Sequence, residues 1–384
     1  MPKIDLSYNW GPENSPPPAA DGLKPRPLAM LRNPLMDLLQ AVREHGSIAA
    51  AARSLGLSYR HVWGELKKWE LRLDQNLIVW EKGMPAELSE FASKLLWAER
   101  QAQARLAAPI ESLKAELERT FSVAFDPSAH LVSLYASHDD ALVRLRELCA
   151  RDALYLDLRF CGSVDAIRAL NEGRCEIAGF HTRSSPHPES LTAHTFKPLL
   201  KPGRHKLIAF ARRTQGLLVR KGNPLQIQQI RDVVQRKARF VNRDLGTGTR
   251  LLLDDLLKED RISSVDINGY LTTEPSHAAV ATAIASGRAD TGVAIESAAQ
   301  AAGLDFVPIA TERYWLACLK SALDSPALVA LRETLMSQGW HQALDGMLGY
   351  EFDQTGQVQS LSRELPWWKL QPRRESVKQT NKLN

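Results

Sequence analysis

The apolar residues between about positions 33 and 73 recur at helical spacing, and this pattern predicts three short helices. The first would begin at Asn33-Pro34, because Asn caps helices and Pro is favoured at their first position. Its apolar stripe consists of Leu35, Leu38, Leu39 and Val42. A second helix would follow Ser47 and end at Gly56, and a third would follow Ser58. Two short helices joined by a glycine-containing turn are typical of a helix-turn-helix.

The third helix of this motif has one apolar face and one polar face. Its apolar positions, at spacings of three and four, are Val62, Leu66 and Trp69. A strand over 77–80, a turn over 82–85 and a return strand at 87–88 would follow it as a wing. We therefore predict a winged helix-turn-helix over residues 29–89, preceded by a flexible, proline-rich leader over residues 1–28.

The exposed face of this motif would carry side chains that can reach the phosphates and base edges of double-stranded DNA. These are Ser47, Ser58, Tyr59, Arg60, His61, Lys67, Lys68 and, at the tip of the wing, Lys82. The alternative is an ordinary helical hairpin with a solvated basic face. DNA binding is the favoured hypothesis, because capping, turn and amphipathic signals coincide in one stretch.

A long linker helix is predicted over residues 90–120. Its apolar residues fall at spacings of three and four, the pattern of a helix that pairs with a copy of itself. This seam consists of Phe91, Leu95, Ala98, Ala102, Leu106, Ile110, Leu113 and Leu117. The alternative is packing within one chain, and Pro109 should kink or restart the helix in either case. We expect a homodimer or a dimer of dimers.

Beyond residue 130 the pattern changes to strands that alternate with helices, which is typical of a parallel α/β sheet. Strands are predicted at 131–136, 155–160, 176–180, 239–242, 292–295 and 306–309, and helices at 140–150, 163–171, 250–257, 277–286 and 326–336. Strands at 206–211, 216–219 and 314–319 would carry the chain between two lobes. The predicted fold class is α/β: a winged helix-turn-helix, a linker helix and a two-lobed domain over 130–350, with a basic tail over 351–384.

Loops at the carboxyl ends of these strands carry the candidate binding chemistry. The segment Gly246-Thr247-Gly248-Thr249 enters a helix, so its free N–H groups and the positive helix end would face the cleft between the lobes. Such a loop suits a small anion, and the alternative is a glycine turn that merely caps a helix. The candidate ligand-binding residues are Ser137, His138, Ser163, His181, Arg243, Gly246, Thr247, Gly248, Thr249, Arg250, Ser276, His277 and Tyr314.

The spacing of these residues argues against metal or catalytic chemistry. His138, His181 and His277 form no pattern typical of zinc ligands on one helix. Ser137-His138-Asp139 contains the residue types of a catalytic triad, but adjacent residues cannot face one another as a triad requires. We therefore expect no catalytic residues, no metal site and no tightly bound cofactor.

Length and charge fit this organisation. The chain has 384 residues, enough for two or three domains with separate cores. Lys and Arg outnumber Asp and Glu by nine to four between Lys24 and Arg72, and such a basic end favours a polyanionic partner. There is no run of 18 apolar residues and no apolar signal segment, so we expect a cytoplasmic protein without a membrane partner. The four cysteines show no paired spacing and should be reduced.

The stretch SIAAAARSLGLSYRHVW resembles the N-terminal domain of ModE-type molybdate-responsive regulators, and it is also similar to LysR-type regulators. The matching positions are Ser47, Ala50, Ala51, Ala52, Gly56, Ser58, Tyr59 and Trp63. Tyr59 and Trp63 favour the ModE type. This resemblance covers about residues 33–120, and the wing here is shorter and lacks a glycine-rich insertion.

The segments NRDLGTGTR and EPSHAAVATAIASGRADTGVAIESAA resemble a periplasmic-binding-protein-like domain related to molybdate-binding and LysR effector domains. Together the two resemblances imply a one-component transcriptional regulator that senses a small anionic effector. Molybdate, tungstate and a molybdopterin-type cofactor are the effectors that the resemblance suggests. The alternative is an enzyme or a ligand-storage protein that acts on a small anion in the cleft.

Overall fold

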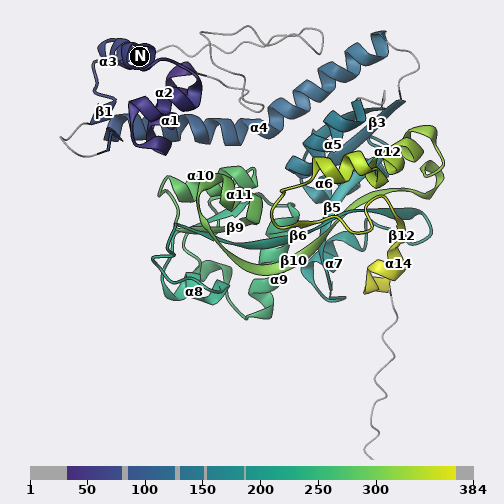
Figure 1. The fold of residues 1–384 in the computed structure, drawn as a ribbon. Coiled ribbons are helices and arrows are strands. Elements are labelled where there is room, and N and C mark those ends of the chain that lie inside the picture. Colours follow the sequence, from purple (N-terminus) through teal and green to yellow (C-terminus); the bar gives the residue numbers. More distant parts are fainter. Residues whose placement is uncertain (1–32, 80–84, 126–129, 151–153, 186, 369–384) are drawn as a thin grey trace, which may run out of the picture.

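The computed structural model describes residues 33–79, 85–125, 130–150, 154–185 and 187–368, without the side chains of residues 118–125. The predicted leader, Lys82 at the wing tip and the tail beyond residue 368 lie outside this described part. Figure 1 shows a helical N-terminal domain, a long helix that leads away from it, and a mixed α/β body.

The N-terminal domain is the predicted winged helix-turn-helix. Its helices are α1 (Pro34–His45), α2 (Ile48–Leu55) and α3 (Tyr59–Leu73), and its wing strands are β1 (Ile78–Val79) and β2 (Glu87–Leu88). The predicted caps are confirmed, because Asn33, Ser47 and Ser58 each accept a hydrogen bond from a backbone N–H in the first turn. Helices α1 and α2 end at Gly46 and Gly56, both in the left-handed region that favours glycine. The wing strands pair antiparallel.

The linker helix α4 (Glu90–Phe125) is one continuous helix of 36 residues. Of the two effects expected of Pro109, a restart of the helix is therefore wrong and a kink remains. Pro109 lies inside the helix and removes one backbone donor. Figure 1 shows α4 leaving the N-terminal domain and changing direction partway along its length. A bend is the usual accommodation of a proline within a helix.

The α/β body is built on one mixed sheet of ten strands, eight of which lie in the order β4-β3-β5-β10-β6-β9-β7-β8. These strands are β3 (His130–Ala136), β4 (Leu154–Phe160), β5 (Ile177–Arg183), β6 (His205–Val219), β7 (Phe240–Arg243), β8 (Thr273–Glu274), β9 (Thr291–Ile295) and β10 (Asp305–Leu319). Strands β3, β4 and β5 are parallel and form the first lobe, and β7, β8 and β9 form the second. Strands β6 and β10 pair antiparallel with each other and join the two lobes.

Helices cover both faces of each lobe. The first lobe has α5 (Asp140–Ala150), α6 (Ser163–Asn171), α7 (Leu191–Phe196), α12 (Pro326–Met336), α13 (Gln338–Ala343) and α14 (Leu361–Glu364). The second has α8 (Ile230–Gln235), α9 (Gly248–Glu259), α10 (His277–Ala285) and α11 (Glu296–Ala302). Two apolar clusters flank the sheet in each lobe, so the predicted two-lobed α/β architecture is confirmed.

Two predicted features of the body differ from the structure. The crossing strands were each expected as two short strands, but β6 and β10 run unbroken for 15 residues each. The two-lobed domain was expected to end at residue 350, but β11 (Tyr350–Glu351) and β12 (Val358–Ser360) pair with β6. Trp367, just after α14, is buried in an apolar cluster of the first lobe. The body therefore extends at least to Trp368, the end of a short 3-10 helix over Pro366–Trp368.

Candidate DNA-contacting helix and interlobe cluster

The first turn of α3 presents the polar face that the sequence predicted. Ser58, Tyr59, Arg60 and His61 are all exposed, while Val62 and Leu66 pack into the core of the N-terminal domain. Arg60 forms no ion pair or hydrogen bond within the described residues, so its guanidinium is available to a phosphate or a base edge.

The remaining predicted DNA contacts differ in their local roles. Ser47 and Ser58 use their hydroxyls as helix caps for α2 and α3. Lys67 pairs with Glu70 at 2.7 Å and lies over the Trp63 ring at 4.9 Å, and Lys68 pairs with Glu65 at 3.2 Å. Exposed pairs of this kind are weak, so both lysines can still turn to a phosphate.

Glu70 also fixes the wing against α3. Its carboxylate accepts hydrogen bonds from the backbone N–H groups of Leu77, at 2.8 Å, and Ile78, at 3.3 Å. Because these two residues lead into and begin the first wing strand, the wing and the exposed face of α3 are held as one unit.

Buried polar side chains gather where the two lobes meet, and we call this group the interlobe cluster. Its members come from both lobes and from the crossing strands: Ser137, Asp139, Ser163, His181, Arg213, Gln215, Arg243, Thr249, His277 and Glu312. The lobes are in direct contact here, since the Val164 N–H donates to the Gly246 carbonyl at 3.3 Å. A Cβ added at Gly248 would lie 2.8 Å from the His181 ring, so this glycine permits close packing of the lobes.

Arg213, on β6, connects the crossing strands to the first lobe within the interlobe cluster. Its guanidinium donates to Asp139 of the first lobe and to Glu312 of β10. A further Nη2 contact reaches the His181 ring at 3.2 Å. Burial opposes the charge of this arginine, but Glu312 and Asp139 outweigh it and raise the pKa of Arg213. Gln215 donates to both Thr249 and Glu312 at 3.0 Å, which joins this network to the second lobe.

The three histidines of the candidate site are in neutral form at pH 7. Burial is the largest cause, and it lowers the pKa of His138, His181 and His277. The positive charge of Arg243 lowers all three values further. All three rings therefore lie within electrostatic reach of Arg243. No group of three or more His, Cys, Asp or Glu side chains suited to a metal ion occurs in the described part of the chain.

Several predicted ligand-binding residues do lie in this region. The hydroxyls of Ser137 and Ser163 are 3.3 Å apart, and the Tyr314 hydroxyl reaches the Ser137 carbonyl at 3.4 Å. The Tyr314 ring packs on the His181 ring with centroids 4.0 Å apart, and the His138 ring packs on Phe160.

Other predicted ligand-binding residues have different partners in the structure. Arg250 lies over the Tyr270 ring at 4.1 Å, pairs with Asp254 one turn along its own helix and donates to the Arg243 carbonyl at 3.4 Å, so its guanidinium already has partners within the second lobe. Thr247 caps α9. Ser276 caps α10 and donates to the Ala104 carbonyl of α4 at 2.9 Å, so its hydroxyl faces the linker helix.

Four residues of the interlobe cluster were not predicted as binding-site residues: Asp139, Arg213, Gln215 and Glu312. Arg213 and Gln215 are two residues apart on β6, so they lie on the same face of this strand. The charge of Arg213 in the middle of a crossing strand was the signal that could have identified it as a residue of the site.

The linker helix contacts both lobes on either side of Pro109. Before Pro109, Arg105 forms two hydrogen bonds of 2.8 Å to the buried Glu274 of the second lobe. After it, Glu111 pairs with the buried Arg146 of α5 at 2.6 Å, and Ser112 accepts from the Phe160 N–H at 3.0 Å. Figure 1 shows α10 beneath one part of α4 and the first lobe beside the rest.

The predicted seam of α4 divides accordingly. Phe91 and Leu95 pack against the core of the N-terminal domain, so they do not belong to a free dimerisation face. An apolar stripe remains exposed, and it consists of Ala98, Ala102, Leu106, Pro109 and Leu113. The predicted alternative of packing within one chain is therefore confirmed for part of α4, and pairing of the exposed stripe with a second copy stays a prediction.

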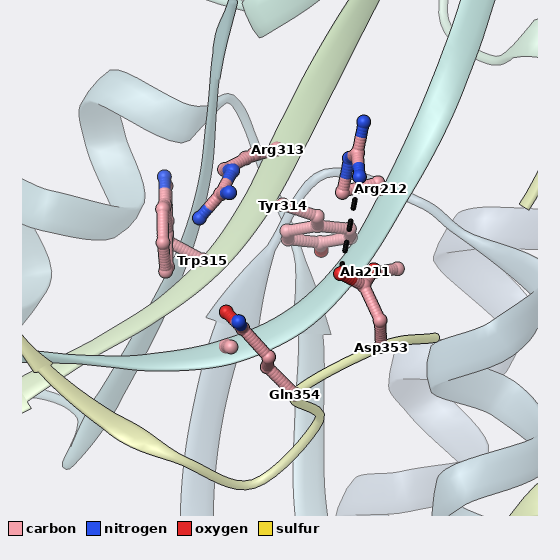
Figure 2. Close-up of a pocket in the computed structure, with 8 residues that line it drawn as sticks. Ala211, Arg212, Arg313, Tyr314, Trp315, Asp353 and Gln354 are labelled. Atoms are coloured by element: carbon pink, nitrogen blue, oxygen red, sulfur yellow. Dashed lines mark ion pairs between the residues drawn. The ribbon is translucent and has the colours of Figure 1, made fainter. Parts of the chain in front are cut away.

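A small recess lies on the crossing strands β6 and β10 (Figure 2). Arg212, Arg313, Tyr314 and Asp353 contribute to its lining. Arg212 pairs with Glu351 and Asp353, and Arg313 pairs with Glu364. Because both cations have carboxylate partners, this recess is a poorer anion site than the interlobe cluster.

Comparison with known families identifies two domains. Residues 35–92 match the bacterial regulatory helix-turn-helix proteins of the LysR family, and residues 146–336 match the PBP superfamily domain. The ModE type, which Tyr59 and Trp63 favoured in the sequence, is not the family matched at these residues. None of the helices in the described part of the chain combines the length and apolar character needed to span a bilayer.

Two curated proteins and many solved structures are similar to the chain. The uncharacterized protein YvgK of Bacillus subtilis (strain 168) is 32% identical over 52% of this chain, and the chain spans 64% of that relative. An uncharacterized protein encoded 5′ of a ferredoxin gene in Clostridium pasteurianum is 32% identical over 28% of this chain and 96% of its own length. The effector-binding domain of QuiR in complex with shikimate is 14% identical, with a TM-score of 0.41 over 54% of this chain and 95% of that one.

Proposed function

The chain belongs to the bacterial regulators that join a LysR-family helix-turn-helix domain to a PBP superfamily domain, and on that premise we propose that it is a one-component transcriptional regulator. It would bind double-stranded DNA through α3 as a homo-oligomer. Binding of a small anionic effector between the lobes would change this DNA binding. Matches to regulatory proteins favour this class over an enzyme.

The unpaired Arg60 on the first turn of an exposed helix is the observation that carries the DNA-binding part of the proposal. In a helix-turn-helix the N-terminal turn of the second helix approaches the base edges in the major groove. Tyr59 stacks on Trp63 with ring centroids 6.3 Å apart, which holds the exposed start of α3 in one conformation.

The anionic effector is supported by the chemistry of the interlobe cluster. Helices α6, α9 and α10 begin at this cluster, and the N-terminus of a helix carries a partial positive charge. Hydroxyl groups of Ser137, Ser163 and Thr249 add hydrogen-bond donors. Such sites suit oxyanions, and we propose molybdate and tungstate as the first probes because of the resemblance noted in the sequence.

The proposal is tested by selecting DNA fragments from the host genome that the purified protein binds. A gel shift with a selected fragment, with and without each anion, then measures the response. Failure to enrich any sequence above random DNA would leave the helix-turn-helix without its proposed role. An enzyme or storage protein would give that result while still binding an anion.

Arg60→Ala is expected to weaken specific DNA binding by about 1–3 kcal/mol if Arg60 reads a base edge, and by less if it holds a phosphate. The selected fragment and a scrambled fragment, compared by gel shift, distinguish these roles. Arg72→Ala is the matched control, because Arg72 lies in the last turn of the same helix. Unchanged affinity in Arg60→Ala would remove this residue from the DNA contacts.

The double substitution of Leu106 and Leu113 by Glu is expected to dissociate the oligomer. These leucines are 38% and 54% exposed, so the change places charge on the apolar stripe of α4 without disturbing a buried core. Sedimentation velocity measures the state of assembly. Lys114→Glu, on another face of α4, controls for added negative charge. An intact oligomer with the wild-type sedimentation coefficient would show that the stripe is not the interface.

A further inference from the structure

Two fully buried arginines of the α/β body have opposite electrostatic surroundings. Arg213 is paired with two carboxylates, those of Asp139 and Glu312. Arg243, at the end of β7, is 2% exposed and forms no ion pair with any carboxylate of the described chain. Its Nη1 donates to the backbone carbonyl of Glu274 at 3.0 Å, and its Nε is buried without a hydrogen-bond partner.

The nearby carboxylate of Glu274 is committed elsewhere. Its oxygens accept from Arg105 of α4 and, at 2.9 Å, from Arg288. Burial is the largest influence on Arg243 and lowers its pKa to about 10. The negative charges of Asp244 and Glu274 act in the opposite direction, but neither carboxylate forms an ion pair with Arg243 in the described chain, and their effect does not outweigh burial. A buried cation without an ion-pair partner destabilises the folded state. Proteins keep such a destabilising residue most readily where it contributes to binding.

A second unpartnered donor belongs to the same group. His277 is 5% exposed, and its Nδ1 has no hydrogen-bond partner among the described residues. It occupies the first position of α10, where backbone N–H groups are free and the helix end is positive. A neutral imidazole can donate from one of its ring nitrogens. Arg243, His277 and this helix end thus offer donors and positive charge.

We propose that the effector carries a deprotonated oxyanion group that binds directly to Arg243 and His277. This inference rests on the proposed function and adds the docking residues and the ligand chemistry. The group is either a tetrahedral oxyanion or the carboxylate of a small acid, because both accept hydrogen bonds from a guanidinium and an imidazole N–H. It would supply the negative charge that Arg243 lacks.

The same residues connect the anion site to the linker helix. The carbonyl of Glu274 accepts from Arg243, while its carboxylate holds Arg105 of α4. An anion that draws Arg243 toward itself therefore acts on the residue that anchors α4 to the second lobe. This contact gives the effector a short physical route to the helix that carries the DNA-binding domain.

The test compares Arg243→Met with the control Arg239→Met. Arg239 is exposed, directly precedes β7 and pairs with Asp290. Calorimetry with the full chain uses molybdate, tungstate, sulfate and inorganic phosphate as tetrahedral probes and acetate and succinate as carboxylate probes. We expect Arg243→Met to weaken binding of the preferred probe by about 10- to 100-fold and Arg239→Met to leave it unchanged. The probe that binds most tightly identifies whether the site prefers a tetrahedral oxyanion or the carboxylate of a small acid.

Thermal unfolding without any anion is the second readout. Removal of an uncompensated buried cation should leave Tm unchanged or raise it, whereas Arg243→Met would lower Tm if the protein itself compensated the charge. A lowered Tm, wild-type anion affinity in Arg243→Met, or binding of none of the probes by the wild-type chain would overturn this inference. DNA selection with the wild-type chain tests the regulator proposal separately. Failure of that selection can therefore be distinguished from failure of the anion site, which calorimetry and Tm measure.

Discussion

Replacing Arg213 by Met is expected to cost about 3–5 kcal/mol of unfolding free energy, because it leaves buried carboxylates without their cation. Asp139 and Glu312 are 1% and 2% exposed, and both accept from Arg213. Tyr350 and the Ala141 N–H also donate to Asp139, but neither supplies a charge. Urea unfolding at pH 7 measures the change.

A triple variant provides the control for this prediction. Changing Asp139 to Asn and Glu312 to Gln together with Arg213→Met removes all three charges, so part of the lost stability should return. A loss below about 1 kcal/mol in the single variant would show that water or side-chain movement solvates the carboxylates. The contrast with Arg243→Met, where stability should not fall, separates a structural arginine from one retained for binding.

Trp367→Ala is expected to destabilise the α/β body by about 3–5 kcal/mol, the usual cost of emptying a buried tryptophan site. Trp367 is 1% exposed and packs in the same apolar cluster as α6, β5 and Trp315. Trp368 is only partly buried beside it, so Trp368→Ala is the matched control and should cost less.

Urea unfolding of both tryptophan variants, followed by far-UV circular dichroism, checks this expectation. Equal stability of Trp367→Ala and the wild type would mean that the segment after β12 is an appendage. A truncated chain that ends at residue 350, the boundary expected from the sequence, should fail to fold. Besides Trp367, it loses β12 and Glu351 of β11, both of which pair with β6.

Features fixed by neighbouring residues were predictable from the sequence. The caps Asn33, Ser47 and Ser58 and the bounds of α6 and α12 depend on interactions within one or two turns, and they are found where the pattern placed them. The winged helix-turn-helix and the two lobes follow from the same local signals together with hydrophobic periodicity.

Features fixed by distant residues were not predictable in this way. Arg213 reads as a solvent-exposed charge that interrupts β6, because its partners lie 74 and 99 positions away in the chain. Arg250 was expected to be available to a ligand, but Asp254 at the next turn, the Tyr270 ring and the Arg243 carbonyl already contact its guanidinium. Ser276 faces α4 because the linker helix packs on α10, which no local pattern reveals.

The position of Pro109 between the two attachments of α4 makes this helix a lever arm. Arg105 is attached to the second lobe and Glu111 to the first, so a rotation of one lobe against the other would be concentrated at the residues between them. From Pro109 to Glu90 the helix rises about 29 Å, and a change of about 10° at Pro109 would displace that end by about 5 Å. That distance is about one and a half base-pair steps of DNA, enough to bring a recognition helix out of register with its half-site.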